Sequence, residues 1–433
     1  MSKNPNSKPR RTEAFYWPKH GFYTRNQQAE WVNTDKETIR MKLIRAGFSS
    51  TKDDFKLSPA SSAMLDVIEK KTVHYAGPLA GHSTGLKELC GKRILVTSQP
   101  PAVCAKRGKF PLWQEIIETQ YGEQSDYFLT WLKTARQRLL LGGGPMLPAL
   151  VCAGLKNTGK SLAQNHLITP LLGGRTAKPW RYWTGETQFN EDLCGAEHLM
   201  LEDDVCPVKP EKRRLFAAAL KAAVANETTS LHPKGDKALS VECLWAISVS
   251  TNLEPQILRQ FPFHEDGCGD KMLVLHIKNR PTCFPDSDDF ETCNKFTRKL
   301  HAEIPAIAAF LDKYVPPEKI KDPEKRSPMA AYRDPYIMEI CSEDDAVPKL
   351  IWLIDESKIL GDPIALERCL TSMDLERDLM NANTNGQAAR LLGKAPLGYL
   401  LREAAKRFPA RIVKFGEAHK GITKWTIRPE RKE

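Results

Sequence analysis

Eight residues near the middle of the chain have the types and spacing of a phosphate-binding loop. They read Gly154-Leu155-Lys156-Asn157-Thr158-Gly159-Lys160-Ser161, a match to G-x-x-x-x-G-K-S. The glycines let successive backbone N–H groups turn inward around a phosphate, and a following helix N-terminus adds positive potential. Lys160 is expected to reach the β- and γ-phosphates of a nucleotide, and the Ser161 hydroxyl to ligate Mg²⁺. We therefore predict that ATP and Mg²⁺ bind here, with these nucleotide-binding residues: Gly154, Asn157, Thr158, Gly159, Lys160, Ser161 and Leu162.

The segments on either side of this loop can position it. The apolar stretch Leu147–Ala153 follows the turn-forming residues 142–145 and predicts a short buried strand. Residues Leu162–Leu172 can continue from the loop as a helix. A strand, a glycine-rich turn and a helix in this order are the setting that a phosphate-binding loop requires.

A second apolar strand ends in carboxylates about forty residues further on. His198–Leu201 precedes Glu202, Asp203 and Asp204. Mg²⁺ prefers hard oxygen ligands, and a second carboxylate can orient an attacking water. Asp203 is our expected Mg²⁺ ligand and Asp204 the water-orienting residue. A shift of one residue would select Glu202 and Asp203 instead, and the spacing leaves both choices open.

A third buried strand, Leu244–Thr251, ends at Asn252. An asparagine at the end of a strand beside the phosphate-binding loop can hydrogen-bond the γ-phosphate or the attacking water. Asn252 is followed by Pro255, and both residue types also form turns. Its position after the two earlier motifs favours the catalytic interpretation.

These three motifs together resemble those of superfamily-three helicases, the AAA+ ring motors of small DNA viruses, phages, plasmids and mobile elements. The resemblance covers about residues 145–282. It implies a ring, expected to be a hexamer, that hydrolyses ATP and acts on single-stranded or forked DNA. Having three acids after the second strand departs from the commonest forms of that family.

Two further parts of the site are implied by the same resemblance. The family carries a helix and then a hairpin with a basic residue that faces the central channel, which here correspond to Phe216–Val224 and a hairpin tip at Pro233–Asp236. Lys234, with Lys237 beside it, would contact DNA. The family also uses an arginine from the neighbouring subunit to stabilise charge on the γ-phosphate. Arg259 lies where the family often places it; the competing arginines are Arg213, Arg214 and Arg280.

The last forty residues predict a small DNA-binding domain. A helix around Leu397–Phe408 is followed by two β-like runs, Arg411–Phe415 and Thr423–Ile427, as in a winged helix. From Lys394 to Glu433 there are 11 Lys and Arg against 4 Glu. Dense positive charge favours nucleic acid, and docking on a protein is the alternative. The expected DNA-binding residues here are Arg402, Lys406 and Lys420.

The whole chain is predicted to be an α/β protein, with an AAA+-type parallel sheet core, an N-terminal α/β and helical region and a C-terminal winged helix. Its 433 residues are enough for several domains. The expected divisions are a disordered tail at 1–13, an α/β region at 14–110, a helical collar at 111–144, the ATPase core at 145–282, a helical region at 283–385 and the winged helix at 386–433. In the α/β region at 14–110, Thr34 and Glu37 are expected to form a capping box before a helix.

Composition limits where the protein works. There are 64 Lys and Arg against 53 Asp and Glu, a net charge of +11, which suits a polyanionic partner. No apolar run approaches the roughly 20 residues of a membrane span, so no membrane is expected. Eleven scattered cysteines without a C-x-x-C pair predict reduced thiols in a cytoplasm.

We thus expect an ATP-dependent, ring-forming DNA helicase that replicates a phage, plasmid or mobile element. The N-terminal region shows no nuclease or primase motif, so a separate primase or initiator is an expected partner. One alternative is an AAA+-like ATPase with a DNA-binding tail that acts as a defence or signalling sensor without unwinding. A second alternative is a monomeric kinase of a small molecule.

Overall fold

The structure is a computed structural model that describes residues 13–51, 56–202, 210–258, 261–263, 268–287, 289–322, 327–342, 346–361, 367–382, 386–393, 396–418 and 422–429. The tail expected to be disordered therefore lies almost wholly outside the described residues. The chain divides into two compact units, Met1–Ile337 and Met338–Glu433, which we describe separately.

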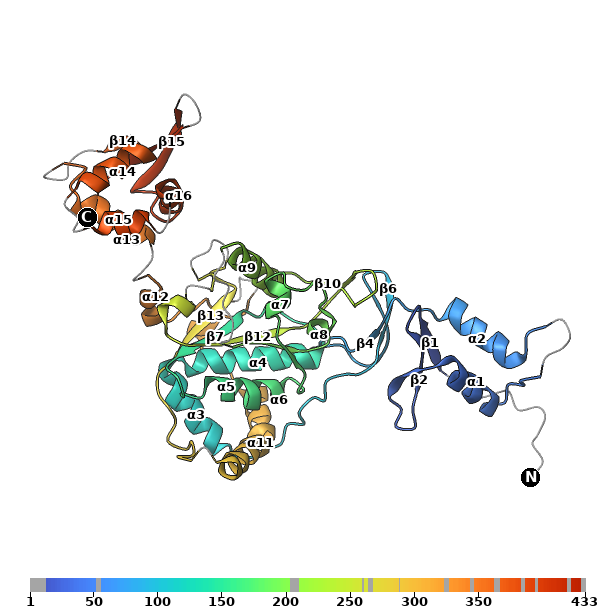
Figure 1. Ribbon diagram of the computed structural model, residues 1–433. Coiled ribbons are helices and arrows are strands. Elements are labelled where there is room, and N and C mark those ends of the chain that lie inside the picture. Colours follow the sequence, from blue (N-terminus) through green and yellow to red (C-terminus); the bar gives the residue numbers. More distant parts are fainter. Residues whose placement is uncertain are drawn as a thin grey trace. The chain divides into compact units, whose positions relative to one another are not determined.

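A five-stranded parallel sheet forms the centre of the first unit (Figure 1). Its strands are β7 (Ala149–Gly154), β8 (Thr176–Ala177), β9 (His198–Leu201), β12 (Ala246–Thr251) and β13 (Met272–Ile277). The strand order is β13-β7-β12-β9-β8, and every neighbouring pair is parallel. All residues of β7, β9 and β12 are buried, as expected for strands covered on both faces. The three predicted strands thus lie next to one another, with β12 between β7 and β9.

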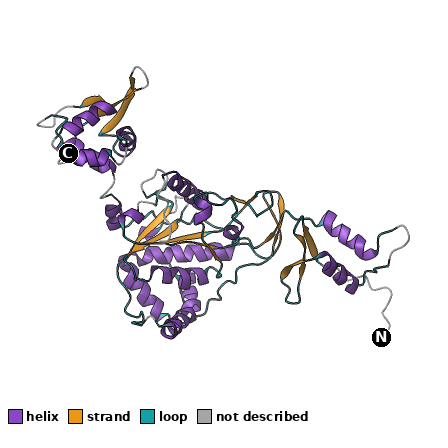
Figure 2. Cartoon of the chain, viewed as in Figure 1, coloured by secondary structure: helices purple, strands orange, loops and turns teal. Residues whose placement is uncertain are grey.

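Helices cover both faces of this sheet (Figures 1 and 2). On one face lie α4 (Ser125–Leu141), α5 (Lys160–Ala163), the π-helical turn η2 (Gln164–Ile168) and α6 (Thr169–Leu171). On the other face lie α7 (Trp180–Trp183) and α9 (Pro210–Ala225). The helix expected over Leu162–Leu172 is therefore interrupted by a π-helical turn, a feature that often accompanies functional sites.

Two more helices pack below α4 and α5. α3 (Pro111–Tyr121) is separated from α4 by the 3₁₀ turn η1 (Gly122–Gln124), so the expected helical collar at 111–144 consists of two helices. The long helix α11 (Phe290–Lys313) holds α3 through its Glu303 carboxylate, which accepts hydrogen bonds from the backbone N–H groups of Leu112 (3.2 Å) and Trp113 (3.0 Å). These contacts satisfy N–H groups that a helix start leaves without partners.

The N-terminal part of the first unit contains two small sheets. β1 (Ala14–Trp17), β2 (Gly21–Arg25) and β3 (Trp31–Thr34) form an antiparallel meander beside α1 (Lys36–Arg45) and α2 (Pro59–Lys70). β4 (Tyr75–Gly77), β5 (Gly85–Leu89) and β6 (Lys92–Val96) form the second, in the order β4-β6-β5. The expected capping box was wrong by one residue. Asp35 caps α1, while the Thr34 hydroxyl lies 2.8 Å from that of Thr24.

The remaining short elements of the first unit are α8 (Glu191–Cys194), β10 (Thr229–Leu231), β11 (Leu239–Val241), α10 (Pro255–Leu258) and η3 (Glu318–Ile320). α12 (Pro335–Ser342) contains the division between the two units. Within the described residues, no helix combines the length and the apolar character needed to cross a membrane.

The second unit has its own core. Its helices are α13 (Ala346–Glu356), α14 (Ser372–Asn381), α15 (Gln387–Leu392) and α16 (Leu397–Arg407), and its strands are β14 (Arg368–Thr371), β15 (Ile412–Ala418) and β16 (Ile422–Ile427). The strands form an antiparallel sheet in the order β14-β16-β15. Leu350 of α13, Leu375 of α14, Leu401 of α16 and Trp425 of β16 belong to one buried cluster. The boundary expected at residue 386 therefore falls inside this unit.

Candidate nucleotide-binding site

The loop between β7 and α5 has the backbone shape that phosphate binding needs. Gly154 ends β7 so close to β13 that an added Cβ would lie 2.5 Å from the Ile277 carbonyl oxygen. Asn157 and Gly159 have positive φ angles of 63° and 87°. Such conformations turn successive peptide groups around a concave loop. α5 begins at Lys160, directly after Gly159.

Lys160 connects the loop to the neighbouring strand β12. Its ammonium Nζ donates to the carbonyl oxygens of Gly154 (3.0 Å) and Leu155 (2.7 Å). It also donates to the Asn252 side-chain oxygen, at 3.3 Å. Both side chains are buried, with 7% and 8% of their surfaces exposed. The lysine and the asparagine, predicted from separate motifs, thus meet at one point.

The carboxyl ends of β7, β12 and β9 lie along the same edge of the sheet because the strands are parallel neighbours. The Ser161 hydroxyl lies 3.5 Å from the Ser250 hydroxyl of β12. Gln164 donates from Nε2 to the Ser248 hydroxyl (2.7 Å) and to the carbonyl of Leu201 (3.4 Å), the last residue of β9. The helix after the loop is thereby attached to the ends of both neighbouring strands.

The carboxylates are described only in part. Glu202 is described and pairs with Lys178, which follows β8, on the side of β9 away from the loop. Asp203 and Asp204 lie outside the described residues. Which two of these three carboxylates serve the metal and the water stays a prediction.

Hydroxyl and carboxylate oxygens are the donors that Mg²⁺ takes, and Ser161 with the neighbouring acidic segment matches this chemistry. Among the described residues, no group of three or more His, Cys, Asp and Glu is arranged to hold a metal by itself.

A buried polar network lies behind this edge. Both ring nitrogens of His198 form hydrogen bonds: Nδ1 with the Thr169 hydroxyl of α6 (2.7 Å) and Nε2 with the Ser248 hydroxyl of β12 (2.7 Å). Burial lowers the pKa of His198 to about 3, so the ring is neutral near pH 7. Cys152 of β7 is also buried, and burial raises its pKa to about 12. It is therefore a thiol and no nucleophile.

The predicted hairpin is present. β10 and β11 pair in antiparallel fashion, and Lys234 and Lys237 are exposed in the connection between them. The buried Asn190 holds β10 and the start of the connection, since Nδ2 donates to the Ser230 carbonyl (2.6 Å) and Oδ1 accepts from the His232 N–H (2.7 Å).

The turn between β1 and β2 contacts the same connection: Lys19 Nζ donates to the Gly235 carbonyl (3.0 Å), and the His20 ring lies 2.5 Å from the Asp236 carboxylate. The connection is therefore held on two sides, with the side chains of Lys234 and Lys237 exposed.

The arginine candidates are dispersed. Arg259 lies outside the described residues, and Arg213 and Arg214 are on α9. Arg280 follows β13 and donates to the Asn157 carbonyl of the loop in its own chain, at 3.3 Å. That contact with its own loop is an observation that spacing along the chain did not predict.

In the second unit, Arg402 and Lys406 are exposed on α16, and Lys406 pairs with Glu403 at 3.0 Å. Lys420 lies outside the described residues. The missed residues around the loop are Gln120, Gln164 and Phe284; each is a single side chain outside any motif, so no pattern in the sequence marks it.

Comparison with solved structures shows the fold. The chain is similar to an apo structure of the NrS-1 C-terminal region, residues 305–718, with a TM-score of 0.57 and 11% identity over 96% of both chains. Two further apo structures of that region give TM-scores of 0.54 at 11% and 12% identity, with the same coverage. No protein-family model and no curated protein matches the chain. This defines an α/β class of protein with a five-stranded parallel core and several small antiparallel sheets. One solved protein that shares this fold is NrS-1, in its C-terminal region.

Proposed function

We propose that this protein is an ATP-driven DNA helicase of the superfamily-three type, with an AAA+ core, that assembles as a ring, expected to be a hexamer. The observation that carries the proposal is the contact between Lys160 and Asn252 across neighbouring strands. It supports a single nucleotide pocket built from the loop, the acidic strand end and the asparagine. When the five strands are numbered in chain order, their order in the sheet is 5-1-4-3-2. β12, which precedes Asn252, therefore lies between β7, which precedes the loop, and β9, which precedes the carboxylates.

In this proposal each side chain of the pocket has one task. Lys160 and the loop N–H groups bind the ATP phosphates, and Ser161 with Asp203 holds Mg²⁺, which supplies charge neutralisation during phosphoryl transfer. Asp204 orients the attacking water, and Asn252 hydrogen-bonds the γ-phosphate or that water. Arg259 of a neighbouring subunit completes the pocket.

The DNA-binding part of the proposal rests on two basic elements. The exposed tip with Lys234 and Lys237 suits contact with the DNA backbone, because lysines bind phosphates as point charges. In the second unit, α16 followed by the β15–β16 hairpin, with β14 beside β16, supports a winged helix that holds DNA through Arg402, Lys406 and Lys420. Replication of a phage, plasmid or mobile element, with a separate primase or initiator, is the proposed setting.

The test is unwinding of forked DNA by the purified protein with ATP and Mg²⁺. Lys160→Ala is expected to lose ATP binding and unwinding together. Lys234→Ala is expected to lose unwinding while DNA-independent ATP hydrolysis continues, because Lys234 lies between β10 and β11 and the proposed ATP-binding loop lies between β7 and α5. Lys299→Ala, an exposed lysine of α11, is the matched control.

The alternatives give different results in the same assay. If Lys234→Ala still unwinds DNA, this result would count against the proposed contact between the hairpin and the DNA backbone. ATP hydrolysis without any unwinding would favour a sensor ATPase. A protein that stays monomeric with ATP and DNA, as seen by electron microscopy, and phosphorylates a small molecule would favour a kinase.

A further inference from the structure

Three side chains outside the loop motif contact the outer side of the phosphate-binding loop. Gln120 comes from the last turn of α3, and Arg280 and Phe284 come from the segment between β13 and α11. We call these three residues the loop brace. They converge on residues 157–159 of the loop, where the backbone conformation is unusual.

Gln120 is fully buried and connects three segments. Its side-chain Nε2 donates to the Thr158 carbonyl at 2.6 Å. Its own carbonyl accepts from the Lys278 N–H at 3.1 Å. α3, the loop and the start of the 278–285 segment are therefore joined through one residue.

Arg280 contacts the preceding carbonyl of the same loop. Its Nη1 donates to the Asn157 carbonyl at 3.3 Å, and its Nη2 donates to the Pro285 carbonyl at 3.0 Å. The guanidinium carbon lies 5.4 Å from the centre of the Phe284 ring. The arginine is thus held on both sides while it contacts the loop.

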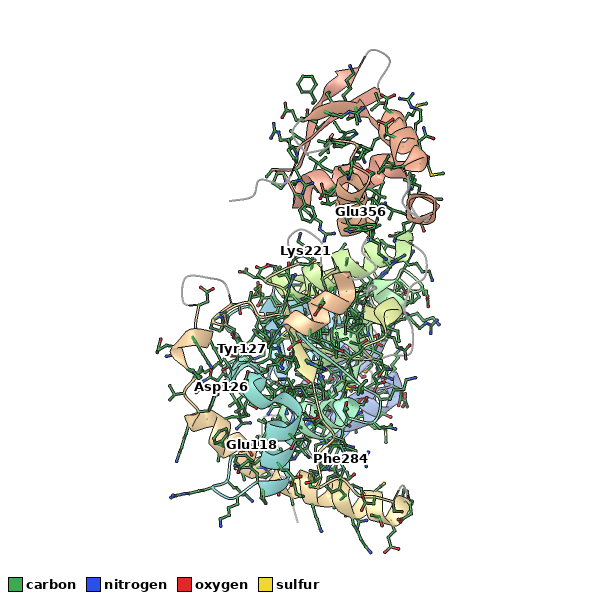
Figure 3. All side chains as sticks on the ribbon, turned by 90° about the vertical axis from the view of Figure 1, so that its left-hand side faces the viewer. Glu118, Asp126, Tyr127, Lys221, Phe284 and Glu356 are labelled. Atoms are coloured by element: carbon green, nitrogen blue, oxygen red, sulfur yellow. The ribbon has the colours of Figure 1, made fainter. Side chains whose placement is uncertain are left out.

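Phe284 occupies the space that a side chain at position 159 would need. A Cβ added to Gly159 would lie 2.5 Å from the Phe284 ring and 2.9 Å from Gln120 Nε2. The segment is fixed to α3, since Glu115 accepts hydrogen bonds from the Thr282 hydroxyl (2.6 Å) and the Cys283 N–H (2.7 Å). Figure 3 labels Phe284 and, on α3, Glu118.

We propose that Gln120 and Arg280 are positioning residues that hold the carbonyls of Asn157 and Thr158 outward, so that the N–H groups of Thr158 and Gly159 face the nucleotide phosphates. In a planar trans peptide the C=O and the N–H point in opposite directions. Fixing two successive carbonyls on the outside therefore fixes the next two N–H groups on the inside. The inference rests on the proposed ATP binding, and it assigns Arg280 to the loop of its own subunit.

The test compares nucleotide affinity between matched variants of the full chain. Gln120→Met and Arg280→Met keep most of the side-chain volume and remove the donors. Each is expected to weaken binding of a fluorescent ATP analogue about fivefold, the effect of one lost hydrogen bond. KM for ATP should rise similarly with kcat nearly unchanged, since the lost contact aids binding of the ground state and of the transition state equally. Arg280→Lys, which keeps one donor, should recover most of the affinity.

Gln114→Met is the control on the same helix, where the glutamine is exposed and its side chain donates to Glu118 at 2.9 Å, away from the loop. If Gln120→Met fails to fold, the affinity of Arg280→Met for the ATP analogue decides the test, because Arg280 is exposed and its replacement leaves the core unchanged. Affinities equal to wild type in both variants would overturn the brace and leave the proposed function intact. A wild-type protein that binds no ATP would overturn both.

A mixing experiment separates the two possible roles of Arg280. Arg280→Met subunits are combined with Lys160→Ala subunits, and ATP hydrolysis is measured at an ATP concentration well below the wild-type KM, where Arg280→Met alone is expected to be about fivefold slower. A brace within one subunit predicts no gain over Arg280→Met alone, because these subunits keep their weakened pocket and the Lys160→Ala subunits bind no ATP. Recovery above the sum of the separate proteins would show that Arg280 serves the neighbouring pocket and would overturn this assignment.

Discussion

At the scale of single residues, the pocket depends on polar atoms that are held by their neighbours. Asn252 is 8% exposed, and its side-chain oxygen lies 3.3 Å from Lys160 Nζ. A buried amide in this position has a fixed direction, since reorienting it would leave polar atoms without partners. Lys156 and Glu254, by contrast, form an exposed ion pair at 3.4 Å that is worth little.

Replacing Asn252 with Ala should separate nucleotide binding from hydrolysis. We expect ATP affinity to stay within a few-fold of wild type, because the loop remains intact. The hydrolysis rate should fall by about 10²-fold, as for the loss of one oriented hydrogen-bonding group in a catalytic site. Single-turnover hydrolysis and equilibrium binding measure the two effects. Asn226→Ala, at the exposed end of α9, is the control; equal rates for both variants would reduce Asn252 to a turn residue.

At the scale of elements, the site depends on how α5, η2 and α6 are attached to the sheet. His198 at the start of β9 and Ser248 in β12 bind Thr169 and Gln164 through the buried network. The π-helical turn begins at Gln164 and ends directly before Thr169. An extra residue in a helix rotates all later residues about the helix axis, so the turn sets which side chains face the sheet.

The neutral His198 predicts acid sensitivity of the first unit. Its pKa is about 3 in the folded protein, against roughly 6.5 in an unfolded chain. Between these values the unfolded state binds more protons, so the free energy of unfolding should fall as pH drops below about 6.5. For this one proton, the free energy of unfolding should decrease by up to about 1.4 kcal/mol for each pH unit.

His198→Gln, which keeps hydrogen-bonding groups but does not titrate, should remove this part of the pH dependence. Urea unfolding of both proteins between pH 7.5 and 5 measures it. His166 and His276, whose pKa values are also lowered by burial, are present in both proteins and cancel in the difference. Identical pH slopes in the two proteins would contradict the prediction.

At the scale of the whole molecule, the chain consists of two units with separate cores. Met338–Glu433 buries Leu350, Leu401 and Trp425 among its own residues. Ion pairs also close within it, as between Arg428 and Glu367 at 3.0 Å. Because these contacts need nothing from the first unit, the second unit is expected to fold alone.

A fragment of residues 338–433 should therefore unfold cooperatively and bind duplex DNA. Arg402→Ala is expected to weaken binding and to reduce the slope of log affinity against log salt by about 0.9, the effect of one lost phosphate contact. Fluorescence anisotropy at several salt concentrations measures both. Arg377→Ala on α14, also exposed, is the control. An unchanged slope with Arg402→Ala would favour docking on a protein.

Much of the architecture was predictable because its signals are local. The loop and its flanking strand follow from residues close together in the chain, whereas the hairpin after α9 was expected only from the resemblance to a known family. The capping of α1 was misplaced because Thr34 found a cross-strand partner in Thr24, which a local motif cannot reveal. The boundary expected at residue 386 lies inside the second unit, because the core of that unit also includes residues of α13 and α14, which no local pattern reveals.

The sequence by itself determined that a strand, a glycine-rich loop and a helix follow one another, and that two further strands end in an acidic residue and an asparagine, because glycine conformations and short apolar runs are local properties. Only the tertiary structure decided which strands are neighbours and what supports the loop. Lys160 and Asn252 are 92 residues apart, and Arg280 and Asn157 are 123 apart. Such contacts form when the sheet and its helices pack as a whole, and no spacing along the chain encodes them.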